Sequence, residues 1–206
     1  MSDKIFLGIC NTQESVPSDF FWSFIGIQSR WEVTPYRSRH PWDVVRNNVI
    51  IDKFLKSDCT ILAKMDIDQK YPSDYFTKLV PLVEKHKVVG PLIYDRWNQN
   101  NFMPLIFSEY NNDGPTMAPI DIKGCHGLME VPYAHTNLFC HREVIEKIDP
   151  PWYEAYLSYS GLGRQNHVDY TFIDKIHKAG YDITIDLDCV VGHQYTGYVG
   201  SDFNGH

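Results

Sequence analysis

The chain has 206 residues, and its hydrophobic fraction of 43% and aromatic fraction of 14% describe a soluble globule with a sizeable core. Its 19 Lys and Arg against 26 Asp and Glu give a net charge of −7, which argues against a surface that grips a nucleic-acid backbone. Five scattered cysteines without Cys-x-x-Cys spacing favour reduced thiols over disulfides or a zinc site. No stretch resembles a signal peptide or a membrane span, so we expect a cytoplasmic protein.

The first two-thirds of the chain alternate apolar strand-like runs with helical patterns. In chain order we expect a strand at 5–10, a helix opened by Pro17-Ser18-Asp19, an extended piece near Val33, a helix led by Pro41, and a strand at 60–65. A helix capped by Ser73, with Asp74 in its first turn, should end or kink at Pro81 and lead to a strand at 88–94. Strands that alternate with helices imply an α/β fold with a parallel, doubly wound core.

Asp66 and Asp68 follow the apolar run that begins at Ile61. Such a run is typical of a strand buried in a parallel sheet, and open α/β sheets bind ligands at the carboxyl ends of their strands. Alternation along an extended strand would point both carboxylates the same way, so that one hard divalent cation could lie between them. The alternative interpretation is a solvated turn at a strand end.

The segment 95–130 interrupts the alternation. A polar connection at 98–101 precedes two runs, 103–110 and 116–122, which flank the turn-like 111–114 and predict a hairpin. We interpret this insertion as lying over the active-site edge. A long polar loop without a function is the alternative.

The last third of the chain returns to helices and a strand. We expect a short helix at 144–148 stopped by Pro150-Pro151, a helix at 168–178 ended by Gly180, and a strand at 182–191 followed by Gly192-His193. The tail at 194–206, rich in Gly and Tyr, predicts a flexible lid over a bound donor, or ordinary terminal disorder. We expect residues 1–206 to form a single domain.

Four blocks of residues give the chain a resemblance to a known family. They are Arg46-Asn47 with Phe54-Leu55; Asp66-Ile67-Asp68 with Tyr71-Pro72 and Phe76; 131–138 with 142–144 and 151–153; and 167–172 with Gly180, Asp186 and Gly192-His193. Together they cover roughly residues 4–195 and resemble the small bacterial and phage-type glycosyltransferases with the GT-A fold. The chain departs from the family where Val168 replaces a usual glutamate and Ala134-His135 replaces a usual glycine.

The resemblance implies a GT-A-type, Rossmann-like fold with a mixed, mainly parallel sheet and helices on both faces. It also implies a divalent cation, Mn²⁺ or Mg²⁺, that is held by Asp66, Asp68 and His193 and grips the diphosphate of a sugar nucleotide. Negative charge develops on that diphosphate when the glycosidic bond breaks, and a Lewis acid stabilises it. The imidazole nitrogen favours Mn²⁺. A purely structural role is the alternative for His193.

By the same resemblance, Asp169 is the general base that deprotonates the acceptor hydroxyl, with inversion at the anomeric carbon. A carboxylate in the first turn of a helix is also favoured there without any function. The implied donor-binding residues are Asn11, Thr12, Arg46 and Asn47, and the implied acceptor-binding residues are Thr136, Trp152 and Tyr153. Arg46 as a solvated charge and the two rings as core residues are the alternatives.

The expected activity is metal-dependent transfer of a sugar from a nucleotide-sugar donor, such as a UDP sugar, to a hydroxyl of a glycan, a protein or a modified base. Two other classes stay open. A metal-dependent phosphoester hydrolase would need more ligands than the sequence places near Asp66. A non-catalytic nucleotide-sugar or glycan-binding module would tolerate Val168. The sequence indicates no oligomeric state.

Overall fold

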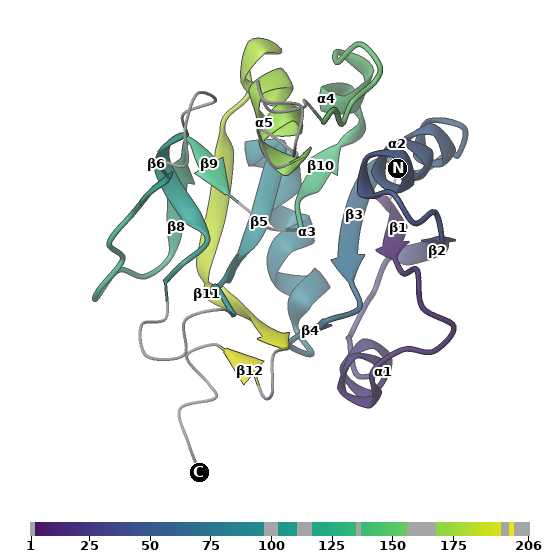
Figure 1. The fold of residues 1–206 in the computed structure, drawn as a ribbon, viewed down its shortest axis with the longest axis horizontal. Coiled ribbons are helices and arrows are strands. Elements are labelled where there is room, and N and C mark those ends of the chain that lie inside the picture. Colours follow the sequence, from purple (N-terminus) through teal and green to yellow (C-terminus); the bar gives the residue numbers. More distant parts are fainter. Residues whose placement is uncertain are drawn as a thin grey trace, which may run out of the picture.

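The computed structural model describes residues 3–96, 103–110, 117–134, 137–155, 168–194 and 198–199. Within them, a nine-stranded sheet has the order β12-β11-β5-β10-β3-β1-β2, and β4 and β8 also pair with β11 (Figure 1). The strands are β1 (Lys4–Cys10), β2 (Glu32–Ser38), β3 (Ile61–Asp66), β4 (Gln69–Lys70), β5 (Val88–Ile93), β8 (Leu128–Val131), β10 (Phe139–His141), β11 (Ile183–Gln194) and β12 (Tyr198–Val199).

The long strands of this sheet run in one direction. β1 pairs in parallel with β2 and β3, and β5 pairs in parallel with β11. The short β10 lies between β3 and β5 and is antiparallel to both. The sheet is therefore mixed and mainly parallel, as predicted. The carboxyl ends of β1, β3, β5 and β11 share one edge, which is where α/β sheets bind ligands.

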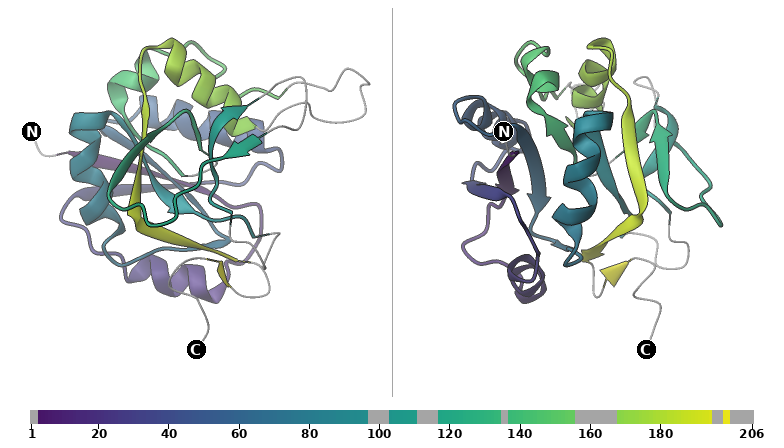
Figure 2. Two further views of the ribbon diagram at one scale, coloured as in Figure 1. Left: turned by 90° about the vertical axis from the view of Figure 1, so that its left-hand side faces the viewer. Right: turned by 180° about the vertical axis from the view of Figure 1, so that it is seen from behind.

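Helices cover both faces of the sheet (Figure 2). They are α1 (Ser18–Ile25), α2 (Asp43–Leu55), α3 (Tyr75–His86), α4 (Arg142–Glu146) and α5 (Val168–Lys178). Helix α2 packs on β1, where the ring of Phe54 lies 5.9 Å from that of Phe6. Helix α3 packs on β10, where the ring of Tyr75 lies 5.2 Å from that of Phe139. Phe139 pairs with Ala63, whereas Phe6 pairs with the preceding residue of β3. Because side chains alternate along a strand, α2 and α3 lie on opposite faces.

The predicted hairpin forms a second, three-stranded sheet. Its order is β7-β6-β9, with β6 (Ile106–Tyr110), β7 (Met117–Pro119) and β9 (Tyr133–Ala134). β6 and β7 are antiparallel, as the hairpin prediction requires. The buried Phe107 of β6 meets Tyr170 of α5 edge to face at 6.2 Å, so the hairpin packs against the start of that helix.

Several predicted boundaries differ from the structure, those of α3, α4 and β11 among them. Helix α3 begins at Tyr75 with Asp74 as an N-cap that makes no side-chain cap bond, and Pro81 lies inside it without ending it. An interior proline costs about 3 kcal/mol, but five buried apolar side chains hold this helix against the sheet. Strand β11 continues to Gln194, beyond its predicted end at 191, because its last residues pair with β4 and β12.

Buried apolar side chains from both faces of the sheet join in one core cluster. All five cysteines are free thiols, and only Cys125 is exposed. None of the helices that the structure describes is long and apolar enough to cross a membrane.

Candidate active site

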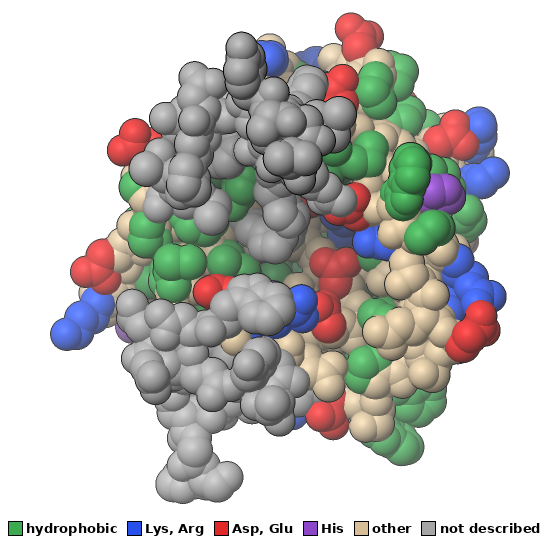
Figure 3. All heavy atoms as spheres, in the orientation of Figure 1, with side chains coloured by type: hydrophobic (Ala, Val, Ile, Leu, Met, Phe, Trp, Pro, Cys, Tyr) green, Lys and Arg blue, Asp and Glu red, His purple; other side chains and the backbone are tan. Residues whose placement is uncertain are grey.

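A cleft of about 670 Å³ opens at the carboxyl edge of the sheet. Figure 3 shows acidic and basic side chains gathered around the hollow at the centre of this face. Its walls come from the ends of β1, β3, β5 and β11 and from the first turns of α2 and α5. Seven of the predicted site residues line it: Thr12, Arg46, Asn47, Asp66, Asp68, Asp169 and His193. Residues from both ends of the chain thus meet in one cleft.

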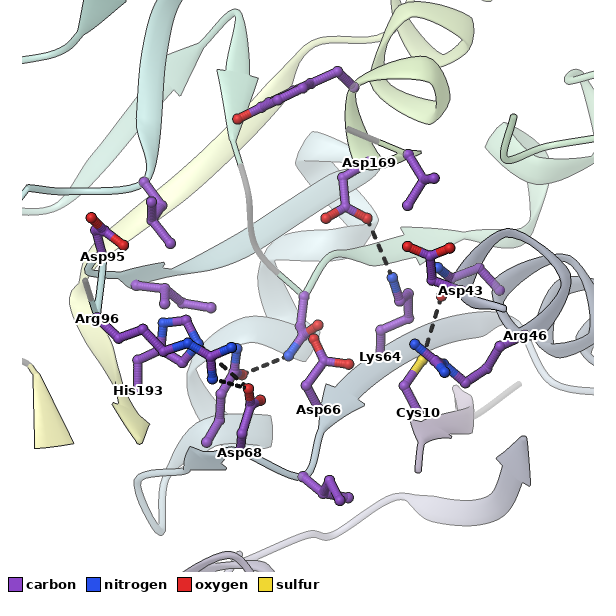
Figure 4. Close-up of a pocket in the computed structure, with 18 of the residues that line it drawn as sticks. Cys10, Asp43, Arg46, Lys64, Asp66, Asp68, Asp95, Arg96, Asp169 and His193 are labelled. Carbon is purple, nitrogen blue, oxygen red and sulfur yellow. Dashed lines mark hydrogen bonds and ion pairs between the residues drawn. The ribbon is translucent and has the colours of Figure 1, made fainter. Parts of the chain in front are cut away.

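Asp68 and His193 lie next to each other in this cleft (Figure 4). Nε2 of His193 is 3.7 Å from Oδ2 of Asp68, and Nδ1 is 3.1 Å from the carbonyl oxygen of Tyr94. A carbonyl oxygen only accepts, so Nδ1 donates and Nε2 is left facing the carboxylate. Metal-binding histidines are commonly oriented by such a bond. The pair therefore presents one carboxylate oxygen and one imidazole nitrogen to the cleft, two ligand types that divalent cations bind.

The pairing of β11 with β4 brings these two residues together. β3 ends at Asp66, and residues 67–68 form a turn into β4. His193 then pairs with Gln69, and the N–H of Gln194 donates to the carbonyl oxygen of Asp68 at 2.7 Å. Asp68 therefore lies in a turn, which corrects the prediction that strand alternation directs the carboxylates of Asp66 and Asp68 to the same side.

Asp66 has different neighbours from Asp68. Its N–H donates to the hydroxyl oxygen of Tyr71 at 2.8 Å, and its Oδ2 lies 3.0 Å from the buried Asn137 amide in the orientation in which that amide donates. Among the described residues, no group of three or more His, Cys, Asp or Glu side chains is placed to hold a metal ion. Of the predicted ligand set, the structure brings Asp68 and His193 together and leaves Asp66 beside them in the cleft.

Arg96 is the cationic neighbour of Asp68. Its Nη1 lies 2.5 Å from Oδ2 of Asp68, the same oxygen that faces His193. Burial alone would raise the pKa of Asp68, but the neighbouring His193 and Arg96 outweigh burial and lower it. The Asp68 carboxylate is therefore ionised at neutral pH.

Asp169 lies in the first turn of α5, across the cleft from Asp68 (Figure 4). Its Oδ1 is 3.8 Å from Nζ of Lys64 in β3, and the two side chains are 17% and 8% exposed. Nζ of Lys64 is also 3.2 Å from the hydroxyl of Tyr153. Because Lys64 and Asp169 both line the cleft, this ion pair faces the space that a substrate would occupy.

The first turns of α2 supply a further cation. Nη1 of Arg46 donates to the carbonyl oxygen of His40 at 3.0 Å, while its buried Nε has no hydrogen-bond partner among the residues described. Oδ1 of the neighbouring Asn47 accepts from Sγ of Cys10 at 3.4 Å. An unpaired buried donor in a cleft is suited to an anionic ligand.

The loop after β1 holds the other two predicted donor-binding residues. Thr12 lines the cleft. Asn11 is only 2% exposed, and its Oδ1 accepts from the N–H of Gln13 at 2.7 Å. Asn11 therefore shapes the loop through this turn, and the prediction that it contacts a donor directly does not match its buried position.

The structure corrects the predicted acceptor platform. The ring of Tyr153 is buried and stacks on Phe172 at a centroid distance of 4.5 Å, and its N–H donates to Oδ1 of Asn48 at 3.0 Å. An acceptor cannot stack on a ring that the core already encloses. Trp152 is half-buried against the core, and neither ring belongs to the described residues that line the cleft. Thr136 lies outside the described residues.

Sequence reasoning did not identify Lys64, Arg96 or Asn137 as site residues. Lys64 carried a signal, because a lysine inside a buried six-residue strand needs a partner. Arg96 and Asn137 carried no local signal, since pairing between distant segments places them. The predicted lid at 194–206 falls outside the described residues except for Gln194 and residues 198–199.

No protein-family model matches the chain, and no curated protein is similar to it in sequence. Solved structures do match. A197 from STIV has a TM-score of 0.63 and 16% identity, over 93% of this chain and 86% of its own. GalNAc-T7, in a structure with UDP, GalNAc and Mn²⁺, has a TM-score of 0.63 and 14% identity, over 94% of this chain and 44% of its own. This chain therefore spans less than half the length of GalNAc-T7, and what it shares with that glycosyltransferase is the GT-A-type α/β fold.

Proposed function

We propose that this chain is a glycosyltransferase that moves a sugar from a nucleotide-sugar donor to an acceptor hydroxyl. One observation carries the proposal: the cleft holds the Asp68–His193 pair on one side and the Asp169 carboxylate on the other (Figure 4). The Asp68–His193 pair suits a cation that binds a diphosphate, and the Asp169 carboxylate suits a general base. The similarity in fold to GalNAc-T7 supports the same function, and the site residues, not the fold, are the reason for proposing it.

On the donor side, Asp68 and His193 would hold a divalent cation, with Asp66 next to them. Carboxylate and imidazole together suit Mn²⁺ better than Mg²⁺. When bound, the cation supplies Lewis-acid stabilisation of the diphosphate leaving group. Arg46 lines the same cleft, and its guanidinium group is suited to bind a phosphate oxygen.

On the acceptor side, Asp169 would act as the general base. Its carboxylate takes the proton of the acceptor hydroxyl while the hydroxyl oxygen bonds to the anomeric carbon. The bond from that carbon to the diphosphate oxygen breaks, and its electron pair leaves with the diphosphate. Attack from the side opposite the leaving group inverts the anomeric configuration. Lys64 holds the Asp169 carboxylate between β3 and α5.

We propose a UDP sugar as the donor, since the GalNAc-T7 structure contains UDP and GalNAc in a similar fold. The proposed acceptor is a hydroxyl of a glycan, a protein or a modified base. The cleft lies at one edge of the sheet and has both acidic and basic walls, which suits a polar sugar next to a charged diphosphate.

The test is donor hydrolysis without an acceptor. Radiolabelled UDP sugars and Mn²⁺ should give slow release of free sugar and UDP, and Asp68→Asn should reduce that rate at least about 100-fold. Asp52→Asn, which removes a carboxylate that pairs with Lys56 on the surface of α2, is the matched control and should leave the rate unchanged. Equal rates in Asp68→Asn and wild type would refute the proposed site.

The products separate the other two functions. A phosphoester hydrolase would release UMP and a sugar phosphate, because it breaks a P–O bond instead of the glycosidic bond. A binding module would retain the intact donor without turnover. Asp169→Asn should still bind the donor, and its transfer to an acceptor should be lost.

A further inference from the structure

Arg96 makes its ion pair with the one carboxylate oxygen that a cation at His193 would need. Nη1 of Arg96 is 2.5 Å from Oδ2 of Asp68, and Nε2 of His193 faces the same Oδ2 from 3.7 Å. Nη1 also lies 3.5 Å from the carbonyl oxygen of Gln194. The guanidinium group therefore supplies the positive charge at this oxygen, where an inner-sphere metal ion would otherwise supply it.

The backbone at the end of β5 positions Arg96 next to Asp68 and His193. Tyr94, whose carbonyl oxygen orients His193, stands two residues earlier, directly after β5. The N–H of Asp95, which lies between Tyr94 and Arg96, donates to the carbonyl oxygen of Met103 at 2.8 Å and so fixes the backbone there. One short segment thus holds both the imidazole and the arginine. The Arg96 side chain, which is 29% exposed, has to move for Oδ2 to become available.

A bound donor would offer Arg96 a second partner of the same charge as Asp68. Arg96 lines the cleft beside Asp68 and His193, where the diphosphate of the proposed donor would lie, and Arg46 lines it at the far end (Figure 4). A guanidinium group binds phosphate and carboxylate oxygens in the same paired geometry. An arginine that leaves Asp68 can therefore bind a phosphate oxygen when the donor is present.

We propose that Arg96 exchanges partners: it pairs with Asp68 in the metal-free protein and with the donor diphosphate in the loaded one. This inference rests on the proposed function. It makes cation and diphosphate bind synergistically, because each stabilises the state in which Arg96 has left Asp68. Without a nucleotide, Arg96 opposes cation binding.

The experiment measures Mn²⁺ binding directly, from the electron paramagnetic resonance signal of free Mn²⁺, with and without UDP. Arg96→Gln should bind Mn²⁺ at least about fivefold more tightly than wild type in the absence of UDP, the lower end of usual coupling between sites. UDP should increase Mn²⁺ affinity less in Arg96→Gln than in wild type. Arg96→Lys keeps the charge and should lie between them. Arg30→Gln, at an exposed arginine that stacks on Trp31, is the control.

The outcomes separate this inference from the proposed function. Unchanged or weaker Mn²⁺ binding in Arg96→Gln, or an equal effect of UDP in both proteins, would overturn the exchange while leaving the transferase proposal intact. If no variant binds Mn²⁺, the exchange is overturned as well. The cation site of the proposed function fails with it. Sugar release from a UDP sugar in EDTA, with Asp169→Asn as the inactive variant, then tests whether a transferase that needs no metal remains.

Discussion

The ammonium group of Lys64 lies 3.8 Å from Oδ1 of Asp169, although one residue belongs to a mid-chain strand and the other to the last helix. Burial alone would lower the pKa of Lys64, but the nearby Tyr153, Asp169 and other acidic groups outweigh burial and raise it well above its ordinary value. Lys64 is therefore a buried, charged lysine at neutral pH. The ion pair ties α5, and with it the proposed base, to the strand that leads to Asp66.

Breaking this ion pair should reveal coupling in a double-mutant cycle. Asp169→Asn leaves the buried Lys64 charge without its carboxylate, and Lys64→Met leaves the carboxylate without its cation, so each should destabilise the fold. The double variant should be more stable than the sum of the single effects predicts, by about 1 to 3 kcal/mol. Urea unfolding of the four proteins measures this. Additive effects would mean that the two groups do not interact.

The sequence was sufficient for the fold and for part of the site. The apolar run before Asp66 predicted a buried strand, and its carboxyl end does open into the cleft. The turn at Asp68 and the approach of His193 depend on the pairing of β11 with β4, which no local pattern encodes. Tyr153 shows a second limit: an aromatic residue after two prolines is compatible with the surface or the core, and only packing against Phe172 decides.

Acid should remove the stabilisation that Asp68 provides in metal-free protein. The folded-state pKa of Asp68 is lowered from its ordinary value of 3.8, so its contribution is fully present above that value and is lost as the pH falls through the lower folded pKa. Wild type should exceed Asp68→Asn in stability at pH 7, and the difference should shrink below pH 3.8. Urea unfolding in EDTA across this range is the measurement.

Arg96 supplies an internal check on the pH prediction. Because Arg96 is one of the groups that lower the pKa of Asp68, the same comparison made in an Arg96→Gln background should give a smaller difference. The side chain of Asp68 is 38% exposed, so solvent screening keeps the expected effect small. A difference that is independent of pH would show that Asp68 acts through packing instead of charge.

The closeness of α2 to β1 should make Gly8→Ala destabilising. A β-carbon built at Gly8 would overlap Cγ2 of Ile50, so helix or strand must shift, at a cost of about 1 to 3 kcal/mol. Ile50→Leu removes that γ-branch and should recover part of the loss in the double variant. Thermal unfolding of the four proteins tests this. Because α2 also carries Arg46, Gly8→Ala should weaken donor binding too, and unchanged stability in Gly8→Ala would contradict the close packing.

Only Cys125 should react quickly with a thiol reagent in the native protein. It is exposed, whereas the other four thiols are buried. Burial raises the pKa of Cys10 and of Cys140 to about 12, and the thiolate is the reactive form. At pH 8 a colorimetric thiol assay should therefore count one fast thiol, and Cys125→Ser should remove it. Urea should expose the remaining four. A fast second thiol that a UDP sugar protects would show instead that Cys10, which lines the cleft, is open to solvent.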